Sequence, residues 1–152
     1  IQFGDWSSDV CSSDLAGGMI RIFDYAIRIV IAIVLLQTLW FKFRAAPESV
    51  AIFTALHAEP WGRIAAGVVE LAASVLLFLP RAVIFGAGLT LGTMLGAVLA
   101  HIFVIGIAVR GDGGLLFGLA VGVALLSAIC VYIHRADAVV VLRRLKLLPE
   151  RS

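Results

Sequence analysis

Long apolar runs separated by short polar stretches dominate this chain. Four of these runs lie at residues 22–41, 64–79, 82–109 and 115–133. About 20 apolar residues in a helix cross a bilayer core of about 30 Å, so each run has the length, or nearly the length, of a membrane-spanning helix. Helices are favoured over barrel strands because the runs do not alternate with polar residues and because lipid offers the backbone no hydrogen-bond partner. The pattern predicts an all-α fold with a bundle of four transmembrane helices.

The first connection between these runs has a pattern of its own. Pro47 and Glu48 suit the first turn of a helix, where proline loses no hydrogen bond and an acidic side chain meets the positive end of the helix dipole. Val50, Phe53 and Leu56 then recur every three residues. We expect residues 47–57 to form a short amphipathic helix at the membrane interface.

The two ends of the chain differ in composition from its middle. Residues 1–18 are polar and repetitive and resemble a DNA-sequencing adapter translated in one frame, so we expect a non-native segment there, or else a disordered tail. Met19 is a credible natural start. Residues 19–135 are expected to form the membrane domain, and residues 136–152 a basic amphipathic tail on the membrane surface.

Composition supports a membrane protein and excludes several other classes. The chain is 62% apolar and 14% charged with a mean hydropathy of +1.08, whereas soluble domains are about 45–50% apolar and about 25% charged. A net charge of +2 gives no basic stripe for nucleic acid, so the expected partner is the lipid bilayer. The two cysteines form no C-x-x-C motif, and the histidines lie in separate segments. The sequence therefore indicates neither a dithiol centre nor a metal or haem site.

Lysine and arginine counts predict the orientation in the membrane. Four crossings place both termini and the turn at Pro80 on one side, which holds seven basic residues of the chain, while the other side holds four. The side with more basic residues is normally cytoplasmic. We expect a bacterial-type inner-membrane protein with both termini in the cytoplasm.

Four polar residues within the apolar runs are expected to form a pocket near the outer face: Gln37, Lys42, Glu70 and His101. Glu70 lies about 10 Å inside Arg63, and His101 about 13 Å inside Arg110, so both reach a similar depth. Ionisable groups at such depths are normally paired or functional. One interpretation is that Glu70 and His101 only satisfy each other; the others are a quinone-like or proton-linked site, or a path for an ion or solute.

Small and aromatic residues suggest structural roles. Two stripes of glycine recur every fourth residue and predict close packing between helices; they are Gly88, Gly92 and Gly96, and Gly114, Gly118 and Gly122. Trp40 and Trp61 lie at the ends of apolar runs, where aromatic side chains anchor a helix at the interface.

Several of these motifs together resemble the DoxX family of small integral membrane proteins. They are LQTLWFKF from Leu36, APES from Ala46, EPWGR from Glu59, Glu70-Leu71, Gly96-Ala97 with His101, and GDGGLLF from Gly111. The resemblance implies a compact four-helix membrane protein with Lys42 and Glu70-Leu71 at positions typical of the family. Family relatives are linked to thiosulfate:quinone oxidoreductase subunits and to membrane complexes that counter oxidative stress.

The resemblance leads us to expect a small subunit associated with a quinone-linked or oxidative-stress redox complex. The chain has no cofactor motif of its own, so a bound quinone and redox partner proteins would supply that chemistry, and enzymatic activity of the chain itself stays open. The alternatives are a small proton-coupled transporter, which would need a path reachable from both sides in a homo-oligomer, and a purely structural assembly subunit.

Overall fold

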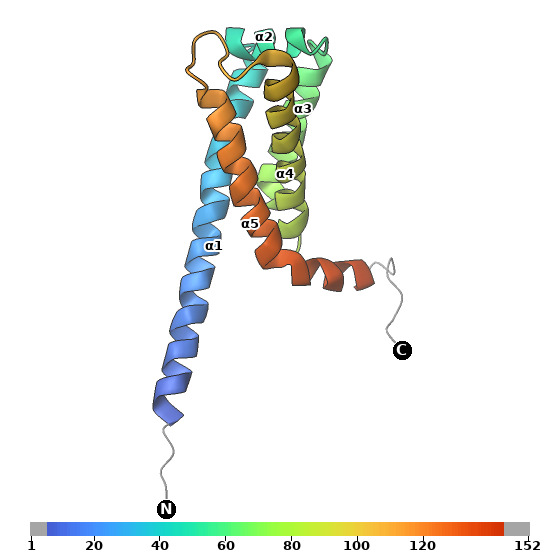
Figure 1. The fold of residues 1–152 in the computed structure, drawn as a ribbon. Coiled ribbons are helices and arrows are strands. Elements are labelled where there is room, and N and C mark those ends of the chain that lie inside the picture. The colour runs from blue at the N-terminus through green and yellow to red at the C-terminus, as the bar shows by residue number, and fades with distance from the viewer. Residues whose placement is uncertain (1–5, 145–152) are drawn as a thin grey trace, which may run out of the picture.

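The computed structural model describes the backbone of residues 6–144 and the side chains of residues 18–136 (Figure 1). Throughout this part of the chain the regular structure is helical and no strand occurs. The elements are α1 (Trp6–Phe43), α2 (Pro47–Ala55), α3 (Trp61–Leu76), α4 (Val83–Ala100), the π-helical turn η1 (His101–Ile105) and α5 (Leu115–Arg144). The predicted all-α class is confirmed.

Four helices form an up-and-down bundle, and α2 lies across one end of it. Neighbouring contacts link α1 with α3, α3 with α4, α4 with α5, and α5 with α1, and the α4–α5 contact is the most extensive. Figure 1 shows that α1 begins, and α5 ends, at the end of the bundle opposite α2. The short α3–α4 connection lies at that same end, since α3 runs away from α2 and α4 returns.

Within the described residues, two segments are long and apolar enough to cross a membrane: Val83–Ile105 and Leu115–Ala136. The 16 residues of α3 span only about 24 Å, which is less than the usual bilayer core. Four crossings are therefore not established. Large apolar side chains on the outside, such as Phe103 at 77% and Ile22 at 73% exposure, suit a lipid environment.

The boundaries of three helices differ from the expected ones. The first helix begins at Trp6, so residues 6–18 continue it where a separate tail was expected. No proline interrupts this stretch, and extending an existing helix is far easier than nucleating one. The third run stops being helical at Ile105, because Gly106 turns the chain with a φ of 88°.

The last helix continues to Arg144, and Figure 1 shows its final turns running sideways from the bundle. The side chains that would make the predicted basic tail amphipathic lie outside the described residues.

The core of the bundle is apolar and tightly closed in its middle. Ile31 and Leu35 of α1, Leu77 after α3 and Val83 of α4 are each at most 1% exposed. The predicted glycine stripes do not contribute to it: a Cβ added at Gly88, Gly92, Gly96, Gly118 or Gly122 would meet nothing within 4 Å. The close helix contact instead occurs at Gly86, where a Cβ would lie 2.7 Å from the Leu77 nitrogen. The predicted stripes therefore do not form the close helix contacts: Gly88, Gly92 and Gly118 are exposed, and Gly96 lines the cavity described below.

Candidate functional site

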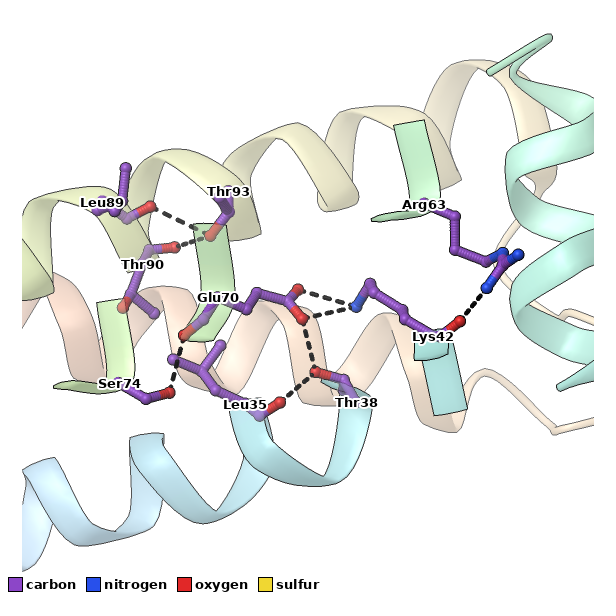
Figure 2. Close-up of polar contacts among 9 residues, drawn as sticks. All are labelled: Leu35, Thr38, Lys42, Arg63, Glu70, Ser74, Leu89, Thr90 and Thr93. Carbon is purple, nitrogen blue, oxygen red and sulfur yellow. Dashed lines mark hydrogen bonds and ion pairs between the residues drawn. The ribbon is translucent and has the colours of Figure 1, made fainter. Parts of the chain in front are cut away.

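A buried ion pair links the first and third helices near the α2 end of the bundle. Lys42 Nζ lies 2.8 Å from Oε2 and 2.9 Å from Oε1 of Glu70, whose residue is only 4% exposed (Figure 2). The Thr38 hydroxyl lies 3.1 Å from the same Oε2 and 2.9 Å from the Leu35 carbonyl, so its one proton is shared between two acceptors. The carboxylate is thus surrounded by donors from a single face of α1.

The direction of helical side chains explains why these groups meet. Side chains lean towards the N-terminus of their helix, and residues four apart share a face. Lys42, in the last turn of α1, therefore leans back towards Thr38 and into the bundle. Because α3 runs antiparallel to α1, the side chain of Glu70 leans towards the same level from the other helix.

Arg63 holds the end of the first helix in place. Its Nε donates to Glu59 Oε1 at 2.8 Å. Its Nη1 donates to the backbone carbonyl of Lys42, as Figure 2 shows. That carbonyl lies in the last turn of α1 and, among the described residues, otherwise accepts only a long bond, at 3.3 Å, from the Ala45 N–H. The Glu59–Arg63 pair therefore fixes the backbone that carries Lys42.

His101 lies where α4 changes into η1. Its Nδ1 lies 2.9 Å from the Gly106 carbonyl, and its ring meets Phe117 edge to face at 5.8 Å between centroids. A carbonyl only accepts, so Nδ1 carries the proton and Nε2 of the neutral ring carries the lone pair. The π-helical turn thus fixes both the position and the tautomer of this side chain, and single π-turns are frequent at functional sites.

These residues surround one cavity of about 510 Å³. Gln37, Lys42, Glu70 and His101 all line it, so the fold brings the four predicted pocket residues to a common space. Most other lining side chains are apolar and come from every helix of the bundle. The second helix contributes Ile52 and Phe53 to the lining of the cavity. A short helix was expected over residues 47–57, and the helix ends at Ala55.

Asp112 adds a fixed negative charge to the lining of the cavity. Its carboxylate accepts backbone N–H groups from Val109 at 2.7 Å and from Gly114 and Leu116 at 3.0 Å each. The N–H groups of Leu116 and Gly114 hold the pKa of the Asp112 carboxyl below its ordinary value. These bonds close the loop before α5, and the carboxylate caps the first turn of that helix.

The pairing within the cavity differs from one of the expected interpretations. Glu70 and His101 are each 4% exposed and so face the interior as their helix positions predicted. They do not satisfy each other, because Glu70 binds Lys42 and Thr38 while His101 binds Gly106. Lys42 is likewise held within the bundle by this pair, with only 14% of its side chain exposed.

The remaining predicted residues lie at the edge of this end of the bundle. Gln37 lines the cavity although the residue is exposed. Trp40 and Trp61 are 60% and 78% exposed, and Trp40 also carries the Arg44 guanidinium 4.4 Å above its ring. Both indoles face outward, where an interfacial anchor must lie.

A second polar cluster joins α1 and α5 towards the other end of the bundle. Asp24 pairs with Arg28 one turn later, and its Oδ1 lies 3.1 Å from His134 Nε2. The same Nε2 lies 2.8 Å from Arg28 Nη2. Asp24 and Arg28 are each 6% exposed, so this network is buried.

Cys130 lies beside this network and is fully buried. Its sulfur and the donor atoms of Asp24 and His134 all lie within 4.8 Å of one another. The sequence alone does not indicate this cluster, because Asp24 and His134 are 110 residues apart on the first and last helices. A signal was present in the spacing: Ser127, Cys130 and His134 share one face of a helix that is otherwise apolar.

Comparison with known proteins gives one match. The family model described as DoxX matches residues 23–105, which is more than half of the chain and includes Lys42, Glu70 and His101. The searches of curated proteins and of solved structures return no match.

Proposed function

Because this chain belongs to the DoxX family, we propose that it is a small membrane subunit of a quinone-linked or oxidative-stress redox complex, with a quinone-type ring binding in the cavity. In this proposal all four bundle helices cross a bacterial-type inner membrane and both termini are cytoplasmic. The chain carries no redox cofactor of its own, so electrons pass through the bound ring and a partner protein.

The observation that carries the proposal is a cavity of about 510 Å³ with a mainly apolar lining and a few polar groups. Small-molecule sites typically enclose about 300–1,000 Å³ and use a few polar groups to orient an otherwise apolar ligand. Lys42 has three N–H donors and uses two on Glu70, so one remains for a ring carbonyl. Glu70 and the unprotonated Nε2 of His101 accept the protons that accompany reduction and oxidation of such a ring.

The middle of the bundle favours this function over transport. Ile31 and Leu35 follow the Asp24–Arg28 turn on α1 and precede Thr38, and both are essentially unexposed. With Leu77 they form an apolar layer between the cavity and the second polar cluster. A proton-coupled transporter would need a polar path through that layer, so transport is the weaker candidate.

The test is binding of a short-chain quinone to the purified full chain in lipid nanodiscs. Lys42→Met removes the free donor and is expected to weaken binding at least tenfold, as is Glu70→Gln. Arg44→Met is the matched control, because it removes a positive charge two residues away that contacts the outward-facing Trp40 instead of the cavity.

Equal affinity in Lys42→Met, Glu70→Gln and the parent chain would contradict the quinone site. In that case proton-coupled flux in liposomes separates the two alternatives, since a transporter loses flux in Glu70→Gln and an assembly subunit has none to lose.

A further inference from the structure

We propose that Asp24, Cys130 and His134 form a binding site for a divalent transition metal ion of the Zn²⁺ type, separate from the cavity. The three side chains supply one carboxylate oxygen, one sulfur and one imidazole nitrogen, and these donor atoms lie within 4.8 Å of one another. Zinc is bound by this mixture of ligands in proteins, and three protein ligands leave one position for water.

The geometry needs only a small adjustment to hold an ion. Bond lengths of about 2.0–2.3 Å in a tetrahedral site place neighbouring donor atoms about 3.3–3.6 Å apart. Asp24 Oδ1 and His134 Nε2 are already 3.1 Å apart. The sulfur of Cys130 is the donor that must approach, by about 1.5 Å at most, since the three donor atoms lie within 4.8 Å of one another. It lies one turn before His134 on the same helix face.

The position of Arg28 indicates that a cation is stabilised where the three ligand atoms converge. Its Nη2 binds Asp24 and lies 2.8 Å from His134 Nε2, so a positive charge already lies beside two of the three ligand atoms. The arginine is incompletely satisfied there, because its Nε is buried and has no hydrogen-bond partner. The fully buried Ser127 hydroxyl, on the same face of α5, also has no partner. Unsatisfied buried groups of this kind are uncommon, and the unpaired Nε–H shows that the cluster does not fully accommodate the guanidinium.

Charge balance favours exchange of the arginine for a metal ion. When Zn²⁺ binds, the Cys130 thiol releases its proton to water, and the ion then has one thiolate, one carboxylate and a neutral imidazole. The net charge of this group is zero, which suits a buried site. Arg28 interacts with the Cys130 thiol only through its charge and a hydrogen bond, whereas zinc bonds to the sulfur directly.

The displaced Arg28 has a route out of the cluster. Its Cζ lies 4.9 Å from the centre of the Tyr25 ring, and Tyr25 is 54% exposed. Long basic side chains readily extend along such rings to reach the membrane interface. We therefore expect Arg28 to rotate towards Tyr25 when the ion binds.

The experiment uses the full chain in detergent micelles with Cys11→Ser, which leaves Cys130 as the single thiol. Zinc and cobalt are titrated separately, because a cobalt–thiolate bond gives a charge-transfer absorption that reports the sulfur directly. We expect one equivalent of either ion, loss of the absorption in Cys130→Ala, and an affinity at least tenfold lower in Asp24→Asn and His134→Ala. His57→Ala is the matched histidine control and should leave the affinity unchanged.

Arg28→Gln gives the sharpest test, because it removes the competing cation without removing a ligand. We expect tighter binding in this variant, and a larger rise in melting temperature on adding zinc than the parent shows. The proposal is overturned if the Cys11→Ser chain gives no cobalt–thiolate absorption. It is equally overturned if Asp24→Asn and His134→Ala, shown to be folded by circular dichroism, bind as tightly as the parent.

Discussion

The bundle holds two buried acid–base clusters of similar composition, and their surroundings differ. Near the α2 end, Glu70 pairs with Lys42 beside a cavity of about 510 Å³. Towards the other end, Asp24 pairs with Arg28 and contacts His134, and none of the three lines that cavity. The comparison shows that a buried ion pair does not by itself identify a ligand site, because a ligand also needs a cavity beside the pair.

The two clusters also differ in how their cations are held. Lys42 meets an acid on another helix, so its pair joins α1 to α3. Arg28 meets an acid one turn away on its own helix, and the link to α5 passes through His134. The first pair therefore stabilises tertiary packing directly, and the second can rearrange with less change to the bundle.

Removal of Glu70 is expected to have the largest effect on stability. Glu70→Ala leaves the Lys42 ammonium buried without a counter-charge, which costs about 3–5 kcal/mol of unfolding free energy. Unfolding in mixed micelles, followed by circular dichroism, measures this loss. The double variant Lys42→Met with Glu70→Leu should recover most of it, because no charge is then left unpaired. An unchanged free energy of unfolding in Glu70→Ala would show that the Lys42 ammonium reaches water when its partner is lost. The two clusters would then not differ in how easily their cations rearrange.

Removal of Asp24 is expected to cost less, about 1.5–3 kcal/mol, as for loss of hydrogen bonds to a charged group. Arg28 lies beside the exposed Tyr25 and can reach the interface when its partner is lost. The same unfolding measurement applies to Asp24→Ala, with Glu48→Ala as an exposed control. A loss equal to that of Glu70→Ala would contradict the view that the second cluster rearranges more easily.

The apolar layer between the clusters can be tested at a glycine. Gly86→Ala places a Cβ 2.7 Å from the Leu77 backbone nitrogen, so the two helices must separate, at a cost of about 1–3 kcal/mol. Gly92→Ala is the control within the same helix, because its Cβ meets nothing within 4 Å. We expect no loss of stability there. Equal losses would show that Gly92 is packed against something in the membrane.

The smallest effect concerns the loop beside the cavity. Backbone N–H groups lower the pKa of Asp112 in the folded chain, so its contribution to stability is present above the unfolded pKa of about 3.9 and is lost as the pH falls through the lower folded value. Asp112→Asn should flatten the acid side of a plot of melting temperature against pH. The two curves should differ little below the folded pKa; a constant gap down to that pH would contradict this assignment.

The sequence predicted the pocket residues better than their partners. Depth counted along helices placed Glu70 and His101 near a common level, because the rise per residue is fixed. It could not reveal that Lys42 binds Glu70, since this depends on which face of α1 meets α3. The glycine stripes fail as predictions of close packing for the same reason. Their spacing predicts a row of glycines along one side of a helix, but it does not predict which helix lies opposite that row.

The amino-acid sequence by itself determined that this chain is helical and apolar, because long uninterrupted apolar runs in lipid leave the backbone no other way to form its hydrogen bonds. It also carried the family motifs around Lys42, Glu70 and His101. Only the tertiary structure decided which charges meet, where the cavity lies, and that residues 24 and 134 face each other. These depend on the rotation and packing of whole helices, which are set by contacts between residues far apart in the chain.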